Sequence, residues 1–165
     1  MTQNDLRLLL KDKKAYGAGF ENHLLEQYKL YVEMADRVSA RRMLANSFFV
    51  GVHTTLTIAF TALLKEDMLT PDWLIAAPFI ALMLLCYVWE RVVKSYRQLN
   101  SGKYKVVLVL EKELPVAPYD AEWTALGKGK DKKLYRPLTG VEKWVPRSFG
   151  ILYIILAVIF YFFKV

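Results

Sequence analysis

The sequence predicts an all-α membrane protein: a helical hairpin of two transmembrane helices, a third C-terminal span and a small helical cytoplasmic domain. Three stretches carry no formally charged side chain, namely residues 43–64, 73–89 and 148–163. A transmembrane helix needs about 20 mostly apolar residues. The first stretch has this length, and apolar neighbours extend the second to about residues 70–93. The third reaches about 24 Å at 1.5 Å per residue, against a hydrocarbon core of about 30 Å, so its charged flanks must extend outward for it to cross.

The basic residues set the predicted orientation. All of the 23 Lys and Arg residues except Lys65 and Lys164 lie in residues 1–42 or 91–147. The turn between the first two stretches holds a single Lys against three acids. Because Lys/Arg-rich flanks stay on the cytoplasmic side, we expect the N-terminus and residues 94–146 in the cytoplasm and the C-terminus outside. This charge distribution is typical of an inner-membrane protein whose basic segments lie in the cytoplasm.

The chain is thereby divided into four predicted parts. Residues 1–42 form an N-terminal arm and a helix that runs into the membrane, and residues 43–93 form the transmembrane hairpin. Residues 94–146 form a cytoplasmic domain of helices and loops, and residues 147–165 form the third span. The net charge of +7 is explained by the segments that flank the spans. We therefore expect membrane lipid, and no nucleic acid, as a partner.

A helix is predicted to run from Phe20 into the first span. No Pro or Gly lies between Phe20 and Phe49, so no residue type that ends a helix intervenes. One face of the cytoplasmic part repeats at spacings of four and three, as in a heptad seam. This seam fits packing against residues 94–146 or contacts between subunits, and the sequence leaves both open. The seam consists of Leu24, Tyr28, Tyr31, Ala35 and Val38.

The cytoplasmic part that follows the second span is less regular. Residues 100–102 (Asn-Ser-Gly) predict a stop or a kink. Residues 103–114 favour a strand by propensity, but they also carry helical faces and a strand would lack a partner, so we predict a helix. A short helix is predicted over residues 119–126, with Asp120 as its cap. The acidic residues of this part, Glu111 among them, are predicted to lie on a solvated face.

The sequence offers little catalytic chemistry. The chain has two histidines, His23 and His53, and one cysteine, Cys86. Their spacing does not match that of metal ligands, and neither a phosphate-binding glycine loop nor a nucleophile elbow occurs. We therefore expect no enzymatic activity, no metal and no cofactor.

Polar side chains of the first span follow one face of its helix. Asn46, His53 and Thr57 project within about 20° of a common direction, and Thr54 and Thr61 lie on its flank. In one interpretation these side chains line a water-filled path between subunits, because ionisable groups at membrane depth usually face a cavity or a partner. In the other, the Thr hydroxyls bond to their own helix and His53 bonds to a neighbouring helix. Polar lining alone does not make a pore, so the second interpretation is favoured.

A second strip of the first span predicts helix packing or contact between subunits. It repeats a small residue every four positions, and small side chains let helix backbones approach closely in lipid. The strip consists of Ser47, Gly51, Thr55 and Ala59. At the cytoplasmic mouth of the hairpin, four charged residues are expected to pair with one another or with a neighbouring subunit. These are Arg41, Arg42, Glu90 and Arg91.

Four segments together resemble the RipA family of octameric bacterial membrane proteins. They are residues 25–49 (LEQYKLYVEMADRVSARRMLANSFF), 89–100 (WERVVKSYRQLN), 114–123 (LPVAPYDAEW) and 141–146 (VEKWVP). The layout is also similar to two-span SLATT-type effector modules found beside bacterial anti-phage signalling genes, although the third hydrophobic run departs from that pattern. The resemblance implies a homo-oligomer, an octamer, in the bacterial inner membrane, and it brings no catalytic residues.

Three functions are open at this point. The first is a non-enzymatic ring of identical subunits whose cytoplasmic helices bind a protein partner or sense a signal, in stress or in host- or phage-related adaptation. The second is a ring that conducts ions or disrupts the membrane, with the first span lining the path. The third is an accessory subunit of a larger membrane complex.

Overall fold

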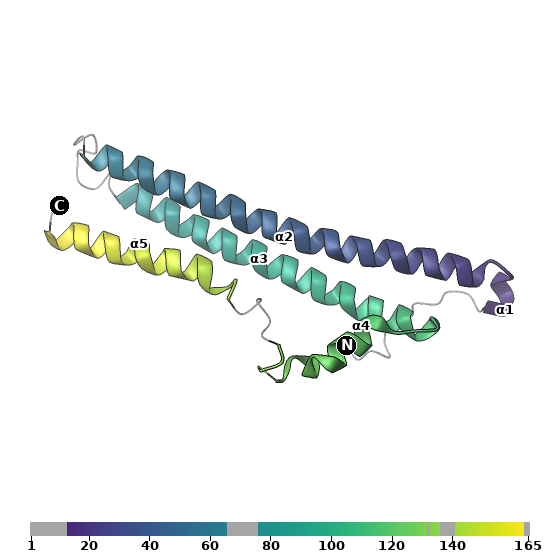
Figure 1. The fold of residues 1–165 in the computed structure, drawn as a ribbon. Coiled ribbons are helices and arrows are strands. Elements are labelled where there is room, and N and C mark those ends of the chain that lie inside the picture. The colour runs from purple at the N-terminus through teal and green to yellow at the C-terminus, as the bar shows by residue number, and fades with distance from the viewer. Residues whose placement is uncertain (1–12, 66–75, 132, 136–140, 164–165) are drawn as a thin grey trace. The chain divides into compact units, whose positions relative to one another are not determined.

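Helices dominate the part of the chain that the structure describes. The computed structural model describes residues 13–65, 76–131, 133–135 and 141–163, and these ranges contain no strand. Three helices are long and apolar enough to cross a membrane, so the predicted fold class is confirmed. In chain order the elements are α1 (Lys13–Tyr16), α2 (Phe20–Lys65), α3 (Ala76–Leu110), η3 (Glu111–Glu113), α4 (Pro118–Ala125), η4 (Gly127–Gly129) and α5 (Trp144–Phe163) (Figure 1). Most of the N-terminal arm and the acidic turn after the first span lie outside the described residues.

The described helices belong to two compact units. Unit 1 comprises Met1–Arg41 and Tyr96–Pro137, and unit 2 comprises Arg42–Ser95 and Leu138–Val165. The long helices α2 and α3 contribute residues to both units, whereas α4 belongs to unit 1 and α5 to unit 2.

The helix α3 continues through the position where a stop or kink was predicted. Residues 100–102 are helical, and α3 ends only at Leu110. A glycine inside a helix costs about 1 kcal/mol relative to alanine. Burial of the apolar side chains of Val107 and Leu110 on the following turns offsets that cost. The prediction of a helix stop at residues 100–102 was therefore wrong, and the prediction of a helix after residue 103 is confirmed as far as Leu110.

The length of α5 removes the difficulty raised by the third apolar stretch. The helix begins at Trp144, before the charge-free residues, and contains 20 residues. At 1.5 Å per residue it is about 30 Å long, which equals the thickness of the hydrocarbon core. The third apolar stretch is therefore the greater part of a helix long enough to span.

Each unit has its own buried residues. In unit 1 the side chains of Leu24, Ala35 and Val38 on α2 are buried. In unit 2 two clusters form the core, and Phe149 on α5 packs against both. The first cluster is Phe49, Trp89 and Val93, and the second is Leu82, Cys86 and Tyr153.

Candidate functional site

The centre of unit 2 is a buried histidine that joins the three long helices. His53 on α2 is fully buried. Its Nδ1 atom lies 2.9 Å from the hydroxyl oxygen of Tyr153 on α5, and its Nε2 atom lies 3.9 Å from Sγ of Cys86 on α3. The Tyr153 hydroxyl also lies 3.2 Å from Oγ1 of Thr57. We call His53, Thr57, Cys86 and Tyr153 the His53 cluster.

Aromatic rings surround the imidazole of His53. The ring centroids of Trp89, Phe149 and Tyr153 lie 5.5, 5.3 and 5.7 Å from that of the imidazole. Trp89 also stacks on Phe49 at 5.6 Å and donates a hydrogen bond from Nε1 to Oδ1 of Asn46 at 2.9 Å. Each polar group on this face of α2 therefore bonds to a group on α3 or α5 of the same chain.

The five side chains considered for a water-filled path fall into two groups. Asn46, His53 and Thr57 face the interior of unit 2, where they make the bonds described above. Thr54 and Thr61 are exposed, and their hydroxyls donate to the backbone oxygens of Val50 and Thr57 at 2.9 and 2.8 Å. The hydroxyl of Thr57 likewise donates to the carbonyl of His53 at 2.7 Å.

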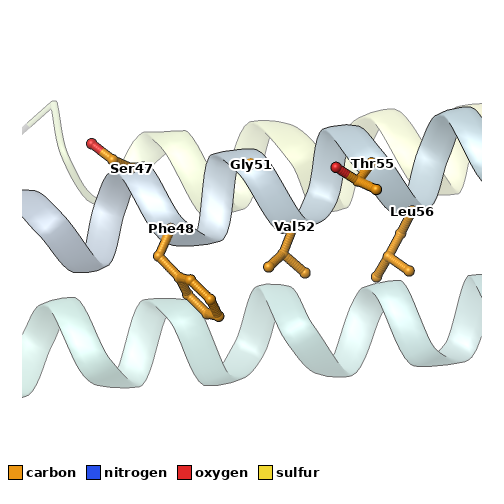
Figure 2. A pocket seen from close by; sticks show the side chains of 6 residues that line it. All are labelled: Ser47, Phe48, Gly51, Val52, Thr55 and Leu56. Carbon is orange, nitrogen blue, oxygen red and sulfur yellow. The ribbon is translucent and has the colours of Figure 1, made fainter.

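The strip of small residues lies on an exposed side of α2. Ser47, Gly51, Thr55 and Ala59 are all exposed, and a Cβ atom added at Gly51 would meet no other atom within 4 Å. Part of the strip lines a hollow of about 490 Å³ on the surface of α2 (Figure 2). Phe48, Val52 and Leu56 form one rim of it and are directed toward α3. The hollow is lined by Ser47, Phe48, Gly51, Val52, Thr55 and Leu56.

Two ion pairs attach α5 and the residues before it to the hairpin. The guanidinium of Arg147 donates to Oε1 of Glu90 on α3, from Nε at 3.1 Å. The guanidinium of Arg42 on α2 lies 3.5 Å from Oε1 of Glu142. Two of the four charged residues at the mouth of the hairpin, Arg42 and Glu90, thus pair with the segment around the start of α5. The remaining two, Arg41 and Arg91, are exposed.

The centre of unit 1 is the buried carboxylate of Glu111, which was predicted from the sequence to lie on a solvated face. Glu111 is only 1% exposed. Its Oε1 atom accepts hydrogen bonds from the Tyr28 hydroxyl at 2.9 Å and from the backbone N–H of Tyr119 at 3.0 Å, and its Oε2 accepts from the N–H of Asp120 at 3.2 Å. We call Tyr28, Glu111, Tyr119 and Asp120 the Glu111 cluster.

Glu111 performs the capping role that was predicted for Asp120. The helix α4 starts after Ala117, which has no side-chain acceptor for the free N–H groups of the first turn. Glu111 supplies that acceptor from outside the helix, and its negative charge suits the positive end of the helix dipole. The prediction of a short helix is confirmed, whereas Asp120 lies inside its first turn. Burial of Tyr28 and its bond to the Glu111 carboxylate raise the pKa of the Tyr28 phenol.

The predicted seam of α2 is covered within unit 1. Besides the buried Leu24, Ala35 and Val38, the ring of Tyr31 receives the ammonium of Lys103, whose Nζ lies 4.6 Å from the ring centroid. Directly after the last seam residue, Ser39 accepts a hydrogen bond from Nδ2 of Asn100 at 3.1 Å. Two seam residues therefore contact other elements of the same chain, Tyr31 through Lys103 on α3 and Tyr28 through Glu111 in η3.

Sequence reasoning missed Tyr153, Trp89 and Glu111 as partners in these clusters. Tyr153 carried a usable signal, because a tyrosine in the middle of a span lies far from the headgroup level that tyrosines favour. Glu111 gave no such signal, since its neighbours Lys112 and Glu113 are charged and exposed. Within the described ranges, no group of three or more His, Cys, Asp or Glu side chains is placed to hold a metal ion.

Comparison with known proteins gives one match. The model of the octameric membrane protein family (8xMP) matches residues 25–163. The matched segment reaches from the second turn of α2 to the last residue of α5. No curated protein and no solved structure matches the chain.

Proposed function

Because the chain belongs to the octameric membrane protein family, we propose that eight copies of it form a non-enzymatic ring in a bacterial inner membrane. The observation that carries this proposal is the contrast between two faces of α2. One face bonds to α3 and α5 through His53 and Asn46. Another face exposes Gly51 and its small neighbours, and such residues in lipid favour a neighbouring helix over acyl chains.

The proposed orientation places unit 1 in the cytoplasm. Basic residues concentrate in residues 1–42 and 91–147, and basic flanks are retained on the cytoplasmic side. In this orientation the N-terminus is cytoplasmic and the C-terminus lies outside.

Unit 1 is proposed to serve as a helical platform that binds a protein partner or senses a signal. The Glu111 cluster holds α4 against η3 and α2. Outside this cluster, Val116, Trp123 and Leu134 are 70%, 40% and 60% exposed. Large apolar side chains that are exposed to water are a feature of contact sites for other proteins.

The mass of the intact particle tests the ring. The protein would be extracted in a native-like lipid disc and weighed by native mass spectrometry. We expect eight chains and no second polypeptide. A particle of one chain would overturn the proposal, and a fixed stoichiometry with another protein would identify an accessory subunit instead.

Ion conduction is a second candidate, and one observation favours it. Thr54 and Thr61 present hydroxyl-bearing side chains on an exposed side of α2. Ion flux into liposomes that contain the ring would be compared between the wild type and a Thr54→Val/Thr61→Val variant. Flux that is lost in the variant supports conduction along this side of α2, whereas absence of flux from both forms rejects it.

A further inference from the structure

The membrane limits how eight copies of this chain can be arranged. In an octamer with dihedral symmetry, two-fold axes would turn half of the copies upside down. The basic flanks insert every copy in the same orientation, which excludes those axes. The remaining closed arrangement is a single ring, in which each contact joins two different surfaces. Any contact that the hollow on α2 makes in such a ring therefore joins it to a different surface of the next copy.

The position of α5 in unit 2 identifies a surface that lies on the side of α2 opposite the hollow. Side chains two residues apart on an α-helix project about 160° apart. Gly51 and Thr55 in the hollow are each two residues from His53 and Thr57, which contact Tyr153 on α5. The hollow and α5 thus lie on nearly opposite sides of α2, and Figure 2 shows α5 behind the helix that carries the hollow.

The two contact surfaces of a copy in a ring lie on well-separated sides of that copy. In a ring of eight, the directions from one copy to its two neighbours differ by about 135°. The side of α2 that carries the hollow and the side that contacts α5 differ by about 160°. The helix α3 is less suited to be the opposite surface, because it borders the hollow at Phe48, Val52 and Leu56.

The outer side of α5 carries protruding side chains that are complementary to the hollow. Ile151 and Ile155 are two residues from Tyr153 and point away from it, with 52% and 48% of each side chain exposed. Their β-branched side chains are stiff at χ1 and lose little freedom on packing. Small residues on one helix and branched aliphatic residues on the other allow close contact in lipid.

We propose that the hollow on α2 receives Ile151 and Ile155 on α5 of the neighbouring copy, and that eight such contacts close the ring. This inference rests on the proposed octamer and names the two surfaces that meet in it. All copies stand at the same height in a ring. Tyr153 lies beside His53 and Thr57 within each chain, so Ile151 and Ile155 lie at about the depth of Gly51 and Thr55.

Oxidative crosslinking in native membranes tests the contact. Cys86, the single cysteine of the chain, is first replaced by Ala. In this background, Thr55→Cys and Ile155→Cys are combined in one chain. Because the two positions lie on opposite sides of unit 2, a disulfide between them has to join two copies. We expect a ladder of covalent products that extends to eight chains.

Three controls make the test decisive. Thr55→Cys alone and Ile155→Cys alone should stay monomeric on a denaturing gel. Thr55→Cys combined with Leu84→Cys, on the exposed side of α3, should give no ladder. Dimers from Thr55→Cys alone would mean that α2 meets α2 and would overturn the inference. A ladder from the Leu84 pair, or none from the Ile155 pair in a particle of octameric mass, would also overturn it. A monomeric mass would instead overturn the proposed function.

Discussion

The two units of the chain each place one polar residue at their centre, but they satisfy it in different ways. Glu111 in unit 1 accepts three hydrogen bonds, two of them from backbone N–H groups at the start of α4. His53 in unit 2 has the Tyr153 hydroxyl as its closest polar partner and lies among three aromatic rings. The first arrangement holds a charged group, and the second relies on uncharged side-chain donors and acceptors.

The two arrangements are expected to differ in strength. Hydrogen bonds to a charged group contribute about 1.5–3 kcal/mol. Bonds between side chains of neighbouring membrane helices average about 0.6 kcal/mol. Replacement of Glu111 should therefore disturb unit 1 more than loss of the Tyr153 hydroxyl disturbs unit 2. The aromatic rings around His53 would then hold the three helices together even when one polar bond is removed.

Glu111→Gln should have the largest effect. The amide nitrogen that replaces one carboxylate oxygen is itself a donor and must face an N–H or O–H donor. We expect the free energy of opening at the amides of Tyr119 and Asp120 to fall by about 2 kcal/mol, which corresponds to about 30-fold faster hydrogen exchange. Hydrogen exchange of the full chain in detergent measures it. Glu113→Gln, in the same 3₁₀ turn but exposed, is the control, and equal exchange in both variants would refute the capping role of Glu111.

Tyr153→Phe should have a smaller effect. The variant keeps the ring and loses both bonds of the hydroxyl to His53 and Thr57. We expect the free energy of separating α5 from the hairpin to fall by about 1 kcal/mol, which corresponds to about fivefold faster alkylation of Cys86 by N-ethylmaleimide. Cys86 is buried beside Tyr153 and is the single cysteine of the chain, so its alkylation reports how often α5 separates from the hairpin. Tyr161→Phe, on the exposed end of α5, should react at the wild-type rate. A rate in Tyr153→Phe equal to this control would show that the aromatic rings alone hold α5.

Glu90→Gln should have the smallest effect. The pair with Arg147 is about half exposed on the arginine side, and exposed ion pairs contribute about 0–1 kcal/mol. We expect the alkylation rate of Cys86 to rise less than twofold, with the excess over wild type disappearing in high salt. If Glu90→Gln matched Tyr153→Phe, the ion pair would be as important for α5 as the His53 cluster.

The sequence was sufficient for the elements that depend on apolar length and charge. The three apolar stretches predicted helices long enough to span, and the structure has them in α2, α3 and α5. The helix after residue 103 and the short helix before Leu126 were also predictable from local patterns. For the polar face of the first span, the favoured interpretation had the Thr hydroxyls bond to their own helix. Thr54, Thr57 and Thr61 make such bonds.

The errors concerned residues whose environment depends on distant parts of the chain. Residues 100–102 were predicted to end a helix because glycine and asparagine often occur at helix ends. Buried side chains on the following turns nevertheless accompany an uninterrupted α3. Glu111 looked solvated because its neighbours are charged. Its donors include the hydroxyl of Tyr28, 83 positions away in the sequence, and no local pattern reveals such a partner.

The contrast between the two sides of α2 is tested most directly by filling the hollow. Gly51→Leu places a large side chain where an added Cβ meets no atom of its own chain, and Gly102→Leu does the same at a matched helical glycine on α3. Both variants would be weighed by native mass spectrometry in lipid discs beside the wild type. We expect eight chains for the wild type and for Gly102→Leu, and fewer for Gly51→Leu. A particle of eight chains from Gly51→Leu would contradict the assignment of this hollow to the contact between copies.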